Sequence, residues 1–228
     1  MLSEYKILSP TGILGYGFPI ESFEEGLAQC PDLIACDAGS TDPGPYYLGS
    51  GKSFTTITAV KRDMSLMLKA ACRLGIPLVI GSAGGSGADI HLSREIGILR
   101  EIAKENALSF RLATISAEFE KDLLIKEYRC GRISPLGAAP EITEKDIEDS
   151  TCIVAQMGVE PIIAAMDEGA QVILAGRCYD PASFAASAIR LGYSKALSIH
   201  LGKLLECATI AAVPGSGSDC MMGYLSED

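Results

Sequence analysis

The sequence contains no tryptophan, only two histidines, and fewer basic than acidic residues. Its 19 Lys and Arg residues against 29 Asp and Glu residues give a formal net charge of -10. A surface this acidic repels nucleic-acid phosphates and anionic lipids, so we expect neither nucleic acid nor a membrane as a partner. No apolar run approaches the ~20 residues that span a bilayer, and the N-terminal MLSEYKILSP has no signal-peptide core. The sequence therefore predicts a cytoplasmic protein that acts on a small molecule.

Paired cysteines are also missing. The eight cysteines include no C-x-x-C pair, and most of them lie inside apolar runs. Because two histidines and no paired cysteines make a poor zinc-ligand set, a structural zinc site is not expected. The sequence predicts reduced, buried thiols rather than a disulfide framework.

The chain instead alternates short apolar runs with helical patterns. Its 228 residues, 48% hydrophobic and 21% charged, suit one α/β domain. Period and composition predict strands over residues 32–37, 76–81, 110–116 and 171–176. They predict helices over residues 58–74, 89–105, 118–128, 151–168 and 197–212, with one more beginning at Asp180 as N-cap and Pro181. No complete element is predicted after residue 212.

Local signals support several of these bounds. Gly75 is placed to end the helix over residues 58–74, Thr143 with Asp146 to begin another, and Pro161 to break the helix over residues 151–168. Apolar strands joined by helical crossovers are parallel and covered on both faces. The prediction is a three-layer α/β fold, with a mostly parallel sheet between helices on both faces, forming a single domain over residues 1–228.

Polar residues follow three of the predicted strands. Asp37 and Asp42 come after the first, the glycine-rich stretch GSAGGSGAD after the second, and Arg177 and Asp180 after the fourth. Because ligands of open parallel sheets bind at the carboxyl ends of the strands, we expect these segments to share one edge and form a site. The long loop DAGSTDPGPYYLGSGK is interpreted as a substrate loop, with an ordinary surface loop as the alternative.

The glycine-rich loop carries candidate substrate-binding residues, namely Ser82, Gly84, Gly85, Ser86 and Gly87. Glycines allow backbone amides to turn toward a ligand, and the following helix N-terminus favours an anion. The favoured interpretation is a phosphate- or carboxylate-binding loop. A loop shaped by sterics alone and a dinucleotide site are the alternatives, and the dinucleotide match is weak because no Tyr-x-x-x-Lys pair accompanies it.

Three acids are candidate ligands for Mg²⁺ or another divalent cation, namely Asp42, Asp89 and Asp180. Carboxylate oxygens suit such a cation. Helix capping is the alternative role for Asp89 and Asp180.

Arg177 is the candidate partner of a substrate carboxylate, because its guanidinium can bind two oxygens at once. A salt bridge to Asp180 or Glu206 is the competing role. The adjacent Cys178 is expected to be buried packing rather than a nucleophile, since no histidine lies near it in sequence.

Asp37, His91 and Glu206 are the candidate catalytic residues. His91 lies in the first turn of the helix after the glycine-rich loop, where it can serve as an acid or base. Glu206 lies in an apolar helix, where a carboxylate is either half-exposed or functional. His200, on an apolar helix, is interpreted as a packing residue.

Taken together, three stretches resemble the acyclic terpene utilisation (AtuA-like) family: DAGSTDPGP, VIGSAGGSGAD, and AGRCYDPASFAASAIRLGY followed by GKLLECA. The family's G-R-x-x-D-x-A segment corresponds to Gly176, Arg177, Asp180 and Ala182, and its L-E-C to residues 205–207. The resemblance runs from about residue 10 to the end and is most specific over residues 174–208. It implies a role in bacterial catabolism. Since family members are commonly longer, a short member, half of a split protein and a fragment are all open.

From the residues and the resemblance, we expect an enzyme of lyase or hydratase type that acts on a small carboxylated or CoA-linked metabolite. A non-catalytic subunit or ligand-binding module of a multi-chain enzyme is the alternative. The expected protein partners are further copies of this chain in a homo-oligomer or a companion subunit. An NAD(P)-dependent oxidoreductase is the third and weakest hypothesis.

Overall fold

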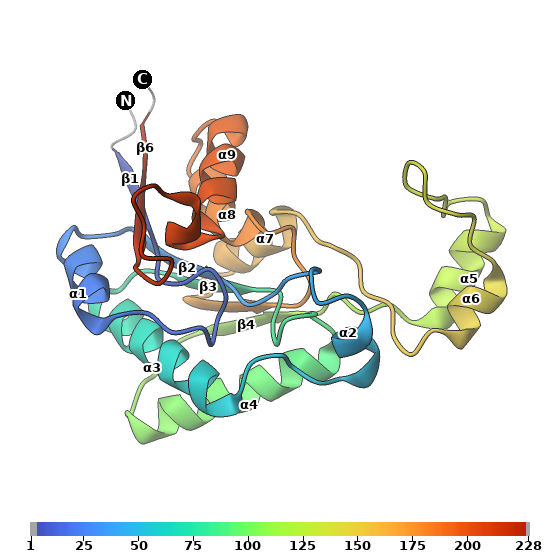
Figure 1. The fold of residues 1–228 in the computed structure, drawn as a ribbon, viewed down its shortest axis with the longest axis horizontal. Coiled ribbons are helices and arrows are strands. Elements are labelled where there is room, and N and C mark those ends of the chain that lie inside the picture. The colour runs from blue at the N-terminus through green and yellow to red at the C-terminus, as the bar shows by residue number, and fades with distance from the viewer. Residues whose placement is uncertain (1–3, 227–228) are drawn as a thin grey trace.

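The computed structural model describes residues 4–226, which fold around a six-stranded sheet (Figure 1). The strands are β1 (Tyr5–Ser9), β2 (Leu33–Asp37), β3 (Leu78–Gly81), β4 (Leu112–Ile115), β5 (Val172–Ala175) and β6 (Met221–Leu225). Their order in the sheet is β4-β5-β3-β2-β1-β6. All neighbouring pairs are parallel except β1 and β6, which are antiparallel.

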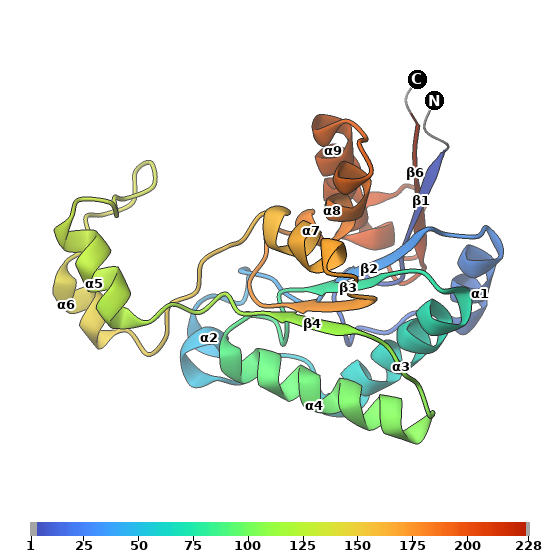
Figure 2. The same cartoon turned by 180° about the vertical axis from the view of Figure 1, so that it is seen from behind.

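The helices divide between the two faces of the sheet. Their bounds are α1 (Ile20–Ala28), α2 (Tyr46–Ser50), α3 (Ile57–Leu74), α4 (Asp89–Glu105), α5 (Lys121–Arg129), α6 (Glu144–Asp149), α7 (Glu160–Asp167), α8 (Ala182–Arg190) and α9 (Lys195–Leu205), followed by a short 3₁₀ turn (Ala208–Ala211). Figures 1 and 2 show α1, α3 and α4 on one side of the sheet and α7, α8 and α9 on the other. The predicted three-layer α/β fold is confirmed.

Alternating side chains of the strands supply a hydrophobic core on each face. In β1, the buried Leu8 joins the core beneath α1, α3 and α4, while the adjacent Ile7 joins the core beneath α7, α8 and α9. Helix α8 is rich in Ala and Ser, and it lies close against the sheet: a Cβ added at Gly81 would come 2.2 Å from Ser183 Oγ. The small residues of α8 therefore set the spacing of that layer.

Helices α5 and α6 stand apart from the three layers, and we call residues 116–156 the arm (Figures 1 and 2). Two extended segments connect it to the sheet, paired through Glu118 and Val154. Ile147 of α6 is buried, whereas α5 has no buried side chain. The arm therefore contributes little to the core.

Most predicted elements are confirmed, and α4 has the predicted bounds. Gly75 ends α3 in the left-handed conformation, and Thr143 with Asp146 forms a capping box at α6. Strands β1 and β6 and helices α1 and α2 were not predicted, and α9 ends at Leu205 rather than at residue 212. Strand β6 lies in the stretch predicted to hold no element, because its short apolar run becomes a strand only by pairing with β1.

Two predictions about helix starts are wrong. Residues 151–158 are not helical, because their backbone hydrogen-bonds to the extended segment over residues 117–119 and to residues 177–179. Helix α7 begins only at Glu160, with Pro161 in its first turn. Asp180 is not the N-cap of α8: that position is Pro181, and the Asp180 carboxylate binds Arg177 and Lys203 instead. Within residues 4–226, no helix is both long enough and apolar enough to cross a membrane.

Candidate active site

The segments that follow β2, β3 and β5 meet at the carboxyl edge of the sheet, as predicted. The Ser82 amide donates to the Gly176 carbonyl at 3.0 Å, and the Arg177 amide donates to the Gly87 carbonyl at 3.2 Å. A Cβ added at Gly87 would lie 2.1 Å from the Arg177 backbone nitrogen, so only glycine permits this approach. The glycine-rich loop and the Arg177 segment therefore form one rigid edge.

Two cavities of about 430 Å³ each open at this edge and share Ser40 and Thr41. The first, which we call the arginine cavity, is lined by Ser40, Thr41, Gly44, Pro45, Leu48, Gly85, Ser86, Val154, Gln156 and Arg177. The second, the lysine cavity, is lined by Gly12, Ile13, Tyr16, Gly39, Ser40, Thr41, Asp42, Asp180, Lys203, Glu206, Cys207 and Ile210. The long loop after β2, predicted to be a substrate loop, contributes to both.

Asp37 is the last residue of β2 and is 1% exposed. Its Oδ1 accepts a hydrogen bond from the Gly39 amide at 3.1 Å, while its buried Oδ2 has no hydrogen-bond partner in the described part of the chain. Burial raises the pKa of Asp37 to about 8, against the opposing effects of the Arg177 charge and of the neighbouring Gly39 amide and Ser82 hydroxyl. Burial therefore favours the protonated form of Asp37 at neutral pH.

Arg177 lies beside Asp37 and begins a chain of alternating charges. Its Nη2 donates to Asp180 Oδ1 at 3.0 Å, and Lys203 Nζ donates to Asp180 Oδ2 at 3.3 Å and to Glu206. The hydrogen bond to Glu206 is the main cause that raises the pKa of Lys203, which therefore stays charged. Arg177 is buried, and its Nη1 has no partner within residues 4–226. The sequence suggested substrate binding or a salt bridge for Arg177; one side of its guanidinium makes the salt bridge and the other is unpaired.

The amides of the glycine-rich loop mostly bind oxygens of the protein itself. Gly84 donates to the Glu95 carboxylate at 2.6 Å, Gly85 to the Ser82 carbonyl at 3.0 Å, and Gly87 to the Ala83 carbonyl at 3.0 Å. Gly85 and Ser86 line the arginine cavity. The loop thus forms a wall of that cavity, and these three amides are already bound to the protein, so its predicted role as an anion-binding loop stays a prediction.

His91 is fully buried and lines neither cavity at the edge. Its Nε2 lies 3.0 Å from the Lys52 carbonyl, and the nearby Arg94 Nη2 donates to the Thr55 carbonyl at 3.0 Å. A carbonyl oxygen can only accept, so Nε2 carries the proton. His91 and Arg94 therefore hold the end of the loop after β2 against α4.

The three predicted metal ligands do not lie together. Asp42 and Asp180 line the lysine cavity, whereas Asp89 accepts a hydrogen bond from the Ser116 hydroxyl and lines a separate pocket at the base of the arm. Among residues 4–226, no group of three or more His, Cys, Asp and Glu side chains is arranged to hold a metal ion. Parallel strands place Asp89 at the same edge, but the first turn of α4 turns its carboxylate away from the cavities.

The remaining sequence candidates have clear places. Glu206 is half-buried in the lysine cavity and bound to Lys203. Cys178 is fully buried, and burial raises its pKa to about 12, as expected for a packing thiol. Sequence reasoning missed Lys203 and Glu95. The stretch GKLLECA did contain a signal for Lys203. Lys203 precedes Glu206 by three residues, so on a helix the two side chains share one face and can form an ion pair.

The comparisons with known proteins point to one family. The family model described as acyclic terpene utilisation family protein AtuA matches residues 56–215. That range includes the glycine-rich loop, Arg177, Asp180, Lys203 and Glu206. Neither the curated proteins nor the solved structures gave a match.

Proposed function

Because the chain belongs to the acyclic terpene utilisation family AtuA, whose model matches well over half of it, we propose that it is an enzyme of that catabolism. Its reaction is of lyase or hydratase type on a small carboxylated or CoA-linked metabolite. The observation that carries the proposal is that Asp37 and Arg177 lie side by side, each with a buried polar atom that has no partner within residues 4–226, and that Arg177 lines the arginine cavity. Perturbed, unpaired groups of this kind are typical of functional sites.

The two side chains supply complementary chemistry. The free Nη1 of Arg177 suits a carboxylate or thioester oxygen of the substrate, and its charge stabilises negative charge that develops there. Asp37 lines neither cavity itself, but it lies beside Arg177, which lines the arginine cavity. In this proposal protonated Asp37 gives a proton to a leaving hydroxyl group, and the Arg177 charge stabilises the resulting carboxylate. Glu206, in the adjoining lysine cavity, is the candidate to accept the proton removed from carbon.

A thermal-shift panel tests this proposal, because a ligand that binds the native state raises its melting temperature. The panel contains crotonate, crotonyl-CoA, citronellate, NAD, NADP and MgCl₂. We expect at least one of the three acyl compounds to stabilise the wild type, and Arg177→Gln to remove that shift. Stabilisation by NAD or NADP alone would favour the oxidoreductase hypothesis. MgCl₂ tests a cation site at Asp42 and Asp180.

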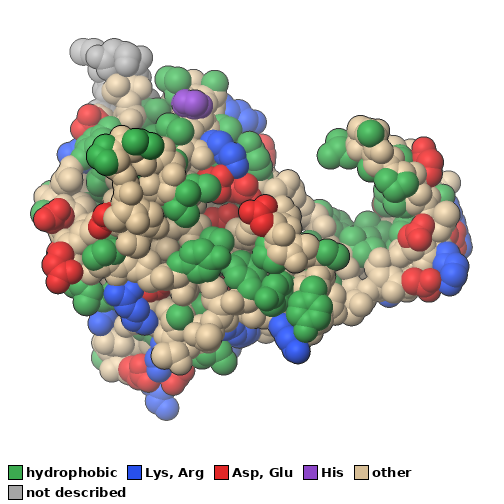
Figure 3. Space-filling model, viewed as in Figure 1, with side chains coloured by type: hydrophobic (Ala, Val, Ile, Leu, Met, Phe, Trp, Pro, Cys, Tyr) green, Lys and Arg blue, Asp and Glu red, His purple; other side chains and the backbone are tan. Residues whose placement is uncertain are grey.

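A binding subunit is the second candidate, and the arm favours it. The arm projects from the sheet layers (Figures 1 and 3), and α5 has no buried side chain. In this case the cavities still bind an acyl compound, but the purified chain does not convert it. Incubation of the chain with the stabilising compound, followed by mass spectrometry of the products, separates the two candidates.

A further inference from the structure

Glu95 is a carboxylate buried in the interior of α4, and neither cavity at the edge includes it. It is 0% exposed, and its Oε1 accepts a hydrogen bond from the Gly84 amide at 2.6 Å. Burial raises its pKa to about 7, while the Gly84 amide and the Arg94 charge oppose that rise. A buried carboxylate is costly, so its presence here calls for a role.

The loop that Glu95 binds has an unusual backbone. Ser82, Gly84, Gly85 and Gly87 all have positive φ angles, of 52°, 64°, 100° and 74°. Glycine adopts positive φ readily, so the three glycines permit this backbone path without fixing it, whereas at Ser82 the conformation is disfavoured and is held by surrounding contacts. The amides of Ser82 and Ala83 bind the end of β5, whereas the Gly84 amide points to the opposite side, toward α4. Glu95 is therefore the contact that holds the middle of the loop.

The position of this loop sets the position of groups in the arginine cavity. The Gly85 carbonyl lies beside the Arg177 guanidinium, since a Cβ added at Gly39 would come within 2.5 Å of that carbonyl oxygen and 3.0 Å of Arg177 Nη1. On its other side, Gly85 packs against the Phe54 ring. A shift of the loop would therefore move Arg177 or the wall formed by Gly85 and Ser86.

We propose that Glu95 is a positioning residue of the proposed active site, which holds the glycine-rich loop through the Gly84 amide and so fixes the wall of the arginine cavity. The inference rests on the proposed function for its consequence, but not for the contact itself. Glu95 touches no ligand in this scheme, because its carboxylate lies on the α4 side of the loop.

Conservative replacement separates this role from simple packing. In Glu95→Gln, the amide oxygen can still accept from Gly84, whereas Glu95→Leu fills similar space with no acceptor. The matched control is Glu101→Leu, which changes an exposed glutamate on the same helix. The measurements are hydrogen exchange of the Gly84 amide by NMR and the dissociation constant of crotonyl-CoA by calorimetry.

We expect Glu95→Leu to speed exchange at Gly84 and to weaken crotonyl-CoA binding, each by about tenfold, as for a lost hydrogen bond to a charged acceptor. Glu95→Gln and the control should stay within about twofold of wild type. Should Glu95→Leu fail to fold, Glu95→Asp serves instead, because the shorter side chain draws the carboxylate away from Gly84, and the same losses are expected.

If Glu95→Leu left hydrogen exchange at the Gly84 amide unchanged, the proposal that Glu95 holds the loop would be wrong. If exchange became fast but the affinity for crotonyl-CoA did not change, Glu95 would hold the loop without positioning the active site. If the wild type binds none of the acyl compounds, the proposed function fails. In that case the exchange measurement alone still decides whether Glu95 holds the loop.

Discussion

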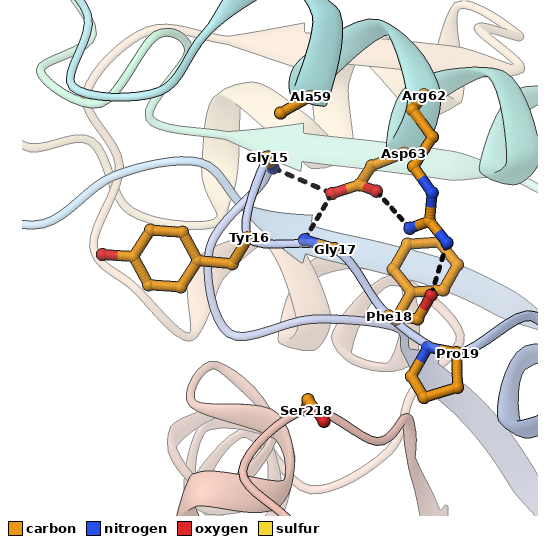
Figure 4. A pocket seen from close by; sticks show the side chains of 9 residues that line it. All are labelled: Gly15, Tyr16, Gly17, Phe18, Pro19, Ala59, Arg62, Asp63 and Ser218. Carbon is orange, nitrogen blue, oxygen red and sulfur yellow. Dashed lines mark hydrogen bonds and ion pairs between the residues drawn. The ribbon is translucent and has the colours of Figure 1, made fainter.

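Two buried aspartates, Asp63 of α3 and Asp37 of β2, face loops in different parts of the molecule and are paired very differently. Asp63 Oδ2 accepts hydrogen bonds from the Gly15 and Gly17 amides, both at 3.0 Å, and its Oδ1 accepts from Arg62 at 2.7 Å (Figure 4). Arg62 in turn donates to the Phe18 carbonyl at 2.6 Å. Asp37 receives one amide and keeps a buried oxygen without a partner in the described chain.

Cavity size does not separate the two regions. The pocket beside Asp63 has a volume of about 440 Å³, close to the 430 Å³ of each cavity at the sheet edge. What differs is the pairing of the buried charges. At Asp63 every carboxylate oxygen is used to hold the loop over residues 15–19, so no polar group of that carboxylate is left to bind a ligand. At Asp37 and Arg177, one polar atom each has no partner within residues 4–226, and the proposed active site rests on this difference.

Among the substitutions that remove a structural contact, we expect the largest loss of stability when Asp63 is replaced. Asp63→Ala removes a buried acceptor from two amides and leaves Arg62 without its carboxylate partner, so we expect a loss of about 3–5 kcal/mol in the free energy of unfolding. Urea denaturation measures it. Asp63→Asn keeps one acceptor oxygen and should lose less. A loss below about 1 kcal/mol for the alanine variant would show that the pairing at Asp63 is not structural.

We expect a smaller loss of stability when Gly87 is replaced by alanine. This substitution tests how closely the glycine-rich loop approaches Arg177. In Gly87→Ala the new Cβ meets backbone atoms of residues 176 and 177 at 2.1–2.7 Å, and backbone cannot move aside cheaply. Gly137→Ala is the matched control, because Gly137 also has a positive φ but no atom within 4 Å of an added Cβ. We expect the Gly87 variant to be less stable than the control by about 2 kcal/mol in urea denaturation. Equal losses would mean that backbone strain alone matters.

The meeting of the loops after β2, β3 and β5 could be predicted from the sequence, whereas the surroundings of several residues could not. Asp37 and Arg177 follow apolar strands, and the carboxyl ends of parallel strands share one edge, so their meeting follows from the fold class. Glu95 and Asp63 lie in helical stretches, REIGILRE and KRDMSLM, where an acid is ordinarily exposed. Their burial depends on loops that pack over them from elsewhere in the chain, and no local pattern reports that.

The same reason explains the errors over residues 151–158 and at Asp180. The apolar residues over 151–158 recur at helical spacing, but the segment instead hydrogen-bonds to Ala117, Phe119 and Tyr179, which are distant in sequence. Asp180 precedes proline at a helix start, which is an N-cap signal, but Arg177 and Lys203 compete for its carboxylate and bind it. Tertiary charge pairing overrides a capping preference worth about 1 kcal/mol.

The last prediction concerns the pH dependence of stability in Asp37→Asn, which sharpens the contrast with Asp63. The folded-state pKa of about 8 lies above the ordinary value of 3.8, so between these pH values the folded chain keeps a proton that the unfolded chain releases. The contribution of Asp37 to stability is therefore greatest below pH 4 and falls as pH rises toward 8. The variant lacks this change.

Urea denaturation of both proteins at several pH values between 4 and 9 measures the difference in unfolding free energy, wild type minus variant. Because one pKa unit corresponds to about 1.4 kcal/mol and the pKa of Asp37 is raised by roughly four, we expect that difference to fall by several kcal/mol, on the order of 5, across the window. Glu95, whose pKa is also raised, titrates in both proteins and cancels in the difference. Parallel curves would mean that Asp37 is already ionised in the folded protein at neutral pH, and Asp37 could then not serve as the proton donor next to Arg177.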